Sequence, residues 1–185
     1  MSDPHNVRPH SHHMHSKRIP LTRMYEYRRK LPHYQKPGKA VFVTFCKNYR
    51  GEPFPDEARD AVLQCCLRGN GNRFRLHAVV VMPEHVHLLL TPLCDEDGWP
   101  CGLAAILKSI KGASARAVNK LLSTSGPVWQ EESFDHVLRS HESLKEKLEY
   151  IRQNPVRRKL VDRPENYRWL WIGQNVCGSD IPVRP

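Results

Sequence analysis

The chain has 185 residues, with 29 Lys and Arg against 19 Asp and Glu, which gives a formal net charge of +10. That length suits one domain with tails better than two domains, and it can bury a core without disulfides or structural metals. The charge points to a polyanionic partner such as a nucleic acid, although a basic protein can also simply be soluble. No apolar run approaches the ~20 residues of a membrane span or resembles a secretory signal, so we expect a cytoplasmic protein.

The composition divides the chain into three parts. Residues 1–30 are basic and rich in His, and with few apolar residues to bury they are expected to form a disordered arm. Residues 31–172 are expected to form the folded domain, and residues 173–185 a C-terminal tail. At the end of the arm, Arg28, Arg29 and Lys30 can lie against a nucleic-acid backbone or can simply be solvated.

Hydrophobic patterning predicts a series of strands and helices in the folded domain. In chain order we expect a strand at 40–45, a helix at 56–67, strands at 74–81 and 86–91 joined by a tight turn at 82–84, a helix at 103–122, a short strand at 134–138 and a helix at 143–154. This order predicts an α+β fold, in which helices pack on one face of a ferredoxin-like antiparallel sheet.

The six cysteines indicate no metal or disulfide framework. No two of them form a CxxC pair, and their spacing fits neither a zinc knuckle nor a set of disulfides. In a reducing cytosol we therefore expect buried free thiols. The cysteines are Cys46, Cys65, Cys66, Cys94, Cys101 and Cys177.

His85 and His87 stand where the chain enters an apolar strand. Alternate residues of a strand point to the same face, so both imidazoles project together while Val86 points the other way. Two imidazoles on one face of a rigid strand provide half of a divalent metal site. Taken alone, a His-x-His pattern is more often a pair of polar residues on the solvent face of a strand.

Tyr150 and Asn154 are four residues apart on a predicted helix and therefore share one of its faces. Pro155 disfavours helical geometry at the residue before it, so we expect the helix to stop at Asn154 and to leave the amide oxygen free for a metal. Gln153 is a less well-placed substitute. Taken alone, Tyr150 is more often a core residue and Asn154 a helix terminator.

The two pairs suggest a chemistry when they are considered together. Two His and an amide oxygen form a mixed set of donors with open positions, which suits Mg²⁺ or Mn²⁺ bridging to a phosphate. A tyrosine beside this set can attack a phosphodiester, because the metal offsets the charge that develops on the phosphoryl oxygen. Tyrosine has an ordinary pKa of roughly 10 and needs such help as a nucleophile.

Basic residues accompany this constellation along the chain. Such side chains can position a nucleic-acid strand on both sides of a cut, or they can form ordinary solvated helix faces. On the predicted helices these candidate DNA-binding residues are Lys108, Lys111, Arg116, Arg152, Arg157 and Arg158.

Several blocks of sequence resemble the signature of the single-tyrosine HUH transposases, and most of all its branch of REP-associated tyrosine transposases. The resemblance extends from about Leu31 to Trp171, in the right order and at the right spacings. The blocks are Val80–Leu89, which contains His85 and His87, then Ser125–Gln130, Phe134–Arg139, and Leu148–Arg157 with Tyr150 and Asn154.

The resemblance implies an HUH endonuclease fold and a DNA transposition activity. It implies His85 and His87 as metal ligands, Tyr150 as nucleophile, and Asn154 as third ligand where related enzymes carry Gln. It also implies a single-stranded DNA substrate with a palindromic hairpin, a monomer or a homodimer, and a place in the nucleoid. Trp129, Gln130, Asp135 and His136 also match signature positions, and we expect them to serve packing.

Two other classes of function fit the sequence less well than a transposase does. A ferredoxin-like module can hold single-stranded nucleic acid without cutting it, but the strands at 74–91 are aliphatic apart from Phe74, which argues against base stacking there. A zinc hydrolase built on His85 and His87 lacks a third His, Cys or carboxylate at a standard interval. It would also leave Tyr150 without a role.

Overall fold

The computed structural model describes residues 38–48, 52–95, 98–138 and 141–174. Its elements are β1 (Val41–Cys46), α1 (Asp56–Leu67), β2 (Phe74–Val81), β3 (His85–Pro92), α2 (Leu103–Leu121), β4 (Phe134–Val137), α3 (His141–Arg157), the 3-10 turn η1 (Pro164–Asn166) and β5 (Leu170–Ile172). The predicted disordered arm, with Arg28, Arg29 and Lys30, lies outside the described residues, as does the predicted tail beyond residue 174.

The strands form one five-stranded sheet in the order β4-β1-β3-β2-β5, and every neighbouring pair is antiparallel. β2 and β3 are joined by the predicted tight turn, in which the Met82 amide donates to the His85 carbonyl at 2.8 Å. The central strand β3 pairs His87 with Thr44 of β1 on one side and with Val80 of β2 on the other. The predicted α+β class with an antiparallel sheet is therefore confirmed.

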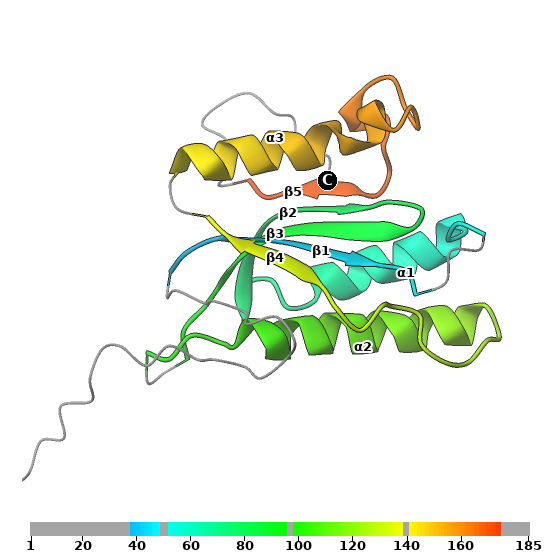
Figure 1. Ribbon diagram of the computed structural model, residues 1–185, viewed down its shortest axis with the longest axis horizontal. Coiled ribbons are helices and arrows are strands. Elements are labelled where there is room, and N and C mark those ends of the chain that lie inside the picture. Colours follow the sequence, from blue (N-terminus) through cyan, green and yellow to red (C-terminus); the bar gives the residue numbers. More distant parts are fainter. Residues whose placement is uncertain (1–37, 49–51, 96–97, 139–140, 175–185) are drawn as a thin grey trace, which may run out of the picture.

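The helices cover both faces of the sheet rather than one. Figure 1 shows α1 and α2 on one side of the strands and α3 on the other, so the expectation of a single covered face is wrong for α3. The physical reason is that β2 and β3 are apolar on both faces: Val79 and Val80, which point to opposite sides, are both fully buried. A second helical layer is needed to remove that second face from water. In the described ranges, no helix is long and apolar enough to cross a membrane.

α3 continues through Pro155 to Arg157, so the predicted stop at Asn154 is also wrong. Proline has no backbone N–H, so the helix lacks one hydrogen bond at Pro155, but the turn after the proline keeps its backbone hydrogen bonds. The Arg158 amide donates to the Asn154 carbonyl at 3.0 Å, and the Leu160 amide donates to the Pro155 carbonyl at 2.9 Å. The helix then ends where Lys159 adopts a left-handed conformation with φ 54°. Asn154 consequently lies inside the helix and not at its free end.

β5 and η1 were not predicted from the sequence. β5 has three residues and pairs with Ala78, Val79 and Val80 of β2. A strand of that length is too short to show an alternation of apolar and polar residues. Tyr167, which precedes β5, also ties this segment to β2, because its hydroxyl donates to the Val81 carbonyl at 2.9 Å.

The expectation of buried thiols is confirmed for Cys65 and Cys66 and wrong for Cys94, which is exposed. None of the five described cysteines forms a disulfide, and Cys177 lies outside the described residues. Cys65 and Cys66 are buried on α1, and burial raises the pKa of both thiols. They therefore act as small apolar groups of the core.

Candidate active site

His85 and His87 project from the start of β3 towards α3, as their spacing predicted. The two Nε2 atoms lie 3.2 Å apart, and the ring centroids are separated by 4.6 Å. His87 is buried with 5% of its surface exposed, whereas His85 is half-buried. The two rings thus point their nitrogens at a common place on the sheet face that α3 covers.

The orientation of His87 is set by β1. The Thr44 hydroxyl lies 2.7 Å from His87 Nδ1, and the Phe42 ring is stacked on the imidazole with centroids 5.3 Å apart. When Nδ1 carries the hydrogen and donates it to the hydroxyl, Nε2 keeps its lone pair on the side of His85. A second contact of this kind is what holds a ligating histidine in one tautomer.

Burial favours the neutral form of both imidazoles. Burial lowers the pKa of His87 to about 3, with further contributions from the neighbouring His85 and from Lys147. Burial also lowers the pKa of His85, against the opposing effect of the Glu84 carboxylate. Neutral imidazoles have a free lone pair, which is the form that binds metal ions.

Tyr150 packs directly on this pair from α3. Its ring centroid lies 5.4 Å from that of His87 and 5.8 Å from that of Phe42. Two cations flank the ring: Lys147 Nζ at 5.5 Å and the Arg157 guanidinium carbon at 5.4 Å from its centroid. Both cations are placed to attract a phosphate group that approaches the phenol.

The position of Asn154 follows from the contacts of Tyr150 and Arg158, the residues one helical turn before and after it. Tyr150 contacts His87, and Arg158 forms an ion pair with Glu84, the residue before His85. Because residues four apart on a helix share a face, Asn154 lies between these two contacts, above the start of β3. It is 7% exposed, and its Oδ1 is buried without a hydrogen-bond partner. A buried amide oxygen with no donor is costly unless something else binds it.

The donor set fits a divalent cation of the hard or borderline kind. Two nitrogens bound at about 2.1 Å to one ion, at an angle between about 90° and 110°, lie roughly 3.0–3.4 Å apart, and the Nε2 atoms fall within that range at 3.2 Å. The described residues hold no cluster of three or more His, Cys, Asp and Glu that could bind a metal. A third donor from this part of the chain would therefore be the orphaned oxygen of Asn154.

Comparison with known proteins identifies the family. The family model described as "Transposase IS200 like" matches residues 39–154, which include β1 and both pairs of site residues. The chain belongs to the IS200-like transposase family. Among curated relatives of this transposase, the REP-associated tyrosine transposase of Escherichia coli strain K12 is 24% identical over 163 residues, covering 86% of this chain and 90% of the relative. The resemblance to REP-associated tyrosine transposases is therefore confirmed.

Solved structures support the fold of the transposase. A REP-associated tyrosine transposase bound to a REP hairpin matches 88% of this chain and 99% of its own, with a TM-score of 0.59 and 21% identity. A bacterial tRNA(His) guanylyltransferase-like protein in complex with GTP matches 68% of this chain and 66% of its own, with a TM-score of 0.51 and 11% identity. Since the fold is shared with a protein of different chemistry, the function has to be argued from the site.

Two of the basic residues in and just after α3 already have carboxylate partners. Arg152 pairs with Glu165 at 2.7 Å and with Glu149 at 3.2 Å. Arg158 pairs with Glu84. Gln153, considered as a substitute for Asn154, donates instead to Glu149 Oε1 at 2.8 Å. Arg157 is the predicted DNA-binding residue that contacts the Tyr150 ring.

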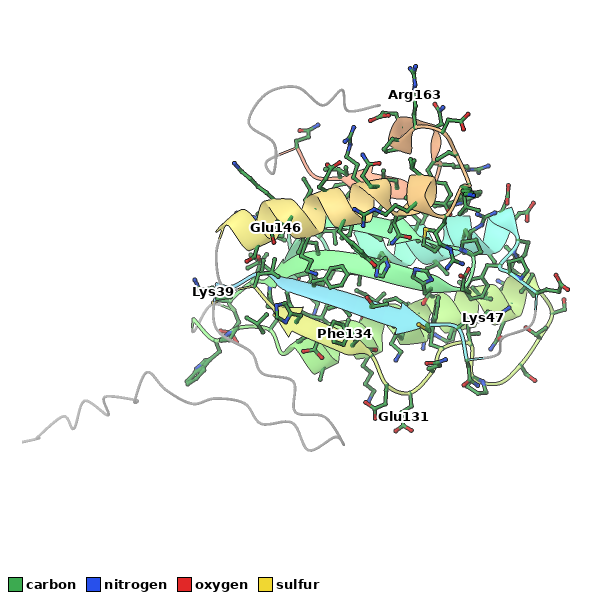
Figure 2. The ribbon with its side chains drawn as sticks, turned by 45° about the horizontal axis from the view of Figure 1, so that its top comes forward. Lys39, Lys47, Glu131, Phe134, Glu146 and Arg163 are labelled. Carbon is green, nitrogen blue, oxygen red and sulfur yellow. The ribbon has the colours of Figure 1, made fainter. Side chains whose placement is uncertain are left out.

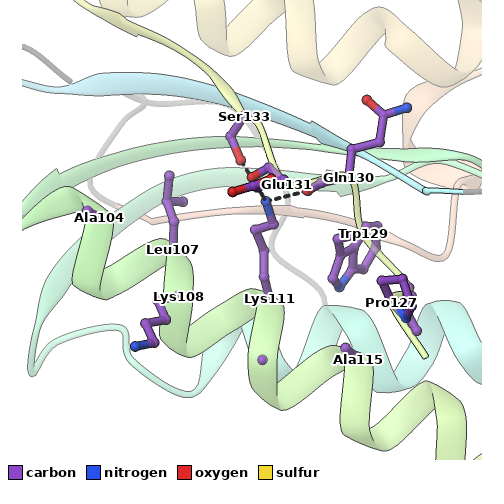
Figure 3. Close-up of a pocket in the computed structure, with 12 residues that line it drawn as sticks. Ala104, Leu107, Lys108, Lys111, Ala115, Pro127, Trp129, Gln130, Glu131 and Ser133 are labelled. Atoms are coloured by element: carbon purple, nitrogen blue, oxygen red, sulfur yellow. Dashed lines mark hydrogen bonds between the residues drawn. The ribbon is translucent and has the colours of Figure 1, made fainter. Parts of the chain in front are cut away.

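The basic residues of α2 lie on the other side of the sheet from Tyr150. Lys111 borders a cavity of about 310 Å³ that Lys108 also lines, between α2 and the segment that precedes β4. Figure 3 shows its ammonium group directed at that segment, where it donates to the Gln130 carbonyl at 2.7 Å, the Glu131 carbonyl at 2.9 Å and Ser133 Oγ at 3.1 Å. Lys111 thus anchors a loop, while DNA binding by Lys108, Lys111 and Arg116 stays a prediction.

Sequence reasoning did not find three residues of the transposase site: Phe42, Thr44 and Lys147. Phe42 and Thr44 reach His87 only through the pairing of β1 with β3. Lys147 lies three residues before Tyr150 on α3, and this helical spacing could have revealed it. Trp129 serves packing as expected: it is buried against Phe45, and its indole nitrogen donates to Ser114 Oγ at 2.9 Å. For His136 the same expectation is wrong, because its side chain is exposed.

Proposed function

We propose that this transposase cleaves and rejoins single-stranded DNA through a covalent phosphotyrosine on Tyr150, with Mg²⁺ or Mn²⁺. The observation that carries the proposal is the packing of Tyr150 on His87, 5.4 Å between ring centroids, beside two converging imidazoles and the orphaned oxygen of Asn154. We propose REP-like palindromic hairpins in the nucleoid as the substrate, because a relative of the same fold was solved bound to a REP hairpin.

In this proposal His85 Nε2, His87 Nε2 and Asn154 Oδ1 hold the cation. When bound, the ion supplies a positive charge that polarises the phosphoryl oxygen of the scissile phosphodiester. The protein contributes rigidity, because His87 is fixed by Thr44 and Phe42 and cannot turn away. Donors held in place before the substrate arrives need no rearrangement during the reaction.

Tyr150 is the nucleophile of the proposed reaction. Its phenolic oxygen gives up its proton and forms a bond to phosphorus while the bond from phosphorus to the leaving sugar oxygen breaks, and that sugar oxygen takes up a proton. Lys147 and Arg157, both close to the ring, attract the phosphate. The phosphotyrosine retains the energy of the broken bond. Attack by a sugar hydroxyl therefore rejoins a strand and releases Tyr150 without ATP.

A covalent adduct assay tests this function. Purified protein is mixed with labelled single-stranded hairpin DNA and Mn²⁺ or Mg²⁺, and the products are separated on a denaturing gel. We expect a protein–DNA adduct that EDTA abolishes. Binding of the hairpins without any adduct, over a broad set of sequences, would favour the second candidate, a non-catalytic protein that binds single-stranded nucleic acid.

Thr44→Val is expected to weaken cleavage by about 10- to 100-fold, which is the usual effect of removing the partner of a ligating histidine. The change keeps the shape of the side chain but removes the hydroxyl that lies 2.7 Å from His87 Nδ1. Thr44→Ser restores a hydroxyl and should recover most of the activity. Metal affinity, measured by calorimetry, should follow the same order, and equal affinities in both variants would contradict the role of Thr44.

Asn154→Leu is expected to separate stability from metal binding. Leucine has a similar size and no unsatisfied oxygen, so the metal-free variant should be more stable than the wild type by about 1 kcal/mol. The same variant should bind Mn²⁺ at least about tenfold more weakly, because one donor is lost. Thermal unfolding with EDTA and calorimetry with Mn²⁺ measure the two effects. A destabilised apo variant with unchanged Mn²⁺ affinity would refute the assignment of Asn154 as a ligand.

A further inference from the structure

The sheet face that carries the candidate site is only partly covered. α3 packs over β2 and β3, whereas β4 lies at the far edge of the sheet, beyond β1. Figure 2 shows Phe134 on β4 at this edge. Phe134 is 63% exposed, and His136, two residues further along the strand, is exposed as well. Alternate residues share a face, so both exposed rings lie on the same side of β4.

Strand register ties these two rings to the site. Phe134 pairs with Thr44, and Thr44 pairs with His87, so Phe134 lies in the same cross-strand row as the metal-site histidine. Two interstrand spacings separate Phe134 from His87, which is roughly 10 Å. In the next row, His136 pairs with Phe42, whose ring contacts Tyr150. The exposed rings of Phe134 and His136 therefore lie on the same sheet face as His87 and extend the surface next to Tyr150.

Phe134 is unusual among the apolar side chains of the described surface. Of the four exposed large hydrophobic residues there, it is the most exposed and the only aromatic one; the others are Leu121, Leu122 and Leu160. An exposed aromatic ring on an edge strand promotes aggregation with other chains. A protein is therefore expected to keep such a ring only where the ring has a use. A flat aromatic side chain beside a nucleic-acid site is also the usual means of holding an unpaired base.

We propose that Phe134 and His136 form a stacking platform for the unpaired nucleobases next to the phosphate that Tyr150 attacks. Lys147 supports this use, because its Nζ lies 5.0 Å from the centroid of the Phe42 ring, between the platform and α3, where it can neutralise a phosphate of the same strand. The inference rests on the proposed function, since it takes DNA to be bound at Tyr150. It adds a base-binding surface on β4 that the cleavage chemistry does not itself require.

Binding of DNA in EDTA, where no cleavage is expected, tests the platform. The probes are hairpins with single-stranded tails, each with 2-aminopurine at one tail position, and a blunt hairpin without tails. Stacking on a ring quenches 2-aminopurine, so the wild type should quench at one or two neighbouring positions. Phe134→Ala should lose this quenching and bind the tailed hairpins about tenfold more weakly. Phe134→Trp should retain both properties.

The controls separate stacking from a general loss of folding or affinity. Leu121→Ala removes an exposed apolar side chain on α2 and should leave binding and quenching unchanged. Binding of the blunt hairpin should be the same for the wild type and Phe134→Ala. If the wild type binds tailed hairpins and Phe134→Ala binds and quenches them equally well, the stacking platform is refuted while the proposed function is not. If the wild type binds none of the DNAs, the platform and the proposed function are refuted together.

Discussion

Tyr150→Phe is expected to abolish the covalent protein–DNA adduct, with a loss of at least about 10³-fold in cleavage, as for removal of other enzymatic nucleophiles. The substitution removes one oxygen and retains the ring, so the contacts with His87 and Phe42 remain. Binding of single-stranded hairpins should therefore keep its affinity. The measurements are adduct formation on a denaturing gel and hairpin binding by fluorescence anisotropy, both on the same preparations.

Tyr167→Phe is the matched control for the nucleophile. Tyr167 is the buried tyrosine whose hydroxyl donates to the Val81 carbonyl and whose ring packs on Trp169. Losing that hydrogen bond should lower stability by about 1 kcal/mol and leave adduct formation intact. An adduct that survives Tyr150→Phe would show that another group attacks the phosphate.

His85→Ala combined with His87→Ala is expected to eliminate metal-dependent cleavage, again by about 10³-fold or more, since the cation that offsets the phosphoryl charge would lose both nitrogen donors. The double variant should still fold, because the apolar body of β3 remains buried between β1 and β2. Calorimetry should show no binding of Mn²⁺, and adduct formation should fall to the level of the wild type in EDTA.

His77→Ala is the matched control for the histidines. His77 is another buried histidine of the same sheet, but its Nε2 bonds to Thr91 Oγ1 at 2.8 Å instead of facing His85 and His87. It should keep both Mn²⁺ binding and adduct formation. Unchanged cleavage in the double variant, with a cooperative unfolding transition like that of the wild type, would remove the metal site from the proposal.

Local patterns were sufficient for most elements of the fold. α1 and β2 have the predicted bounds, because an amphipathic helix between prolines and a turn, and an apolar strand after that turn, are determined by neighbouring residues. The period of a strand also predicted that His85 and His87 share a face, and the period of a helix predicted the same for Tyr150 and Asn154. The local pattern predicted the end of α3 wrongly, because the turn after Pro155 keeps its backbone hydrogen bonds despite the proline.

The sequence by itself determined the α+β class, the two pairs of chemically suitable side chains and, through its resemblance to REP-associated tyrosine transposases, the family. Only the tertiary structure decided that Tyr150 lies on His87, that Thr44 and Phe42 fix that imidazole, and that Phe134 continues the same surface. The physical reason is distance along the chain. Thr44 and His87 are 43 residues apart, and their contact depends on strand pairing and on the burial of both sheet faces, which no local period encodes.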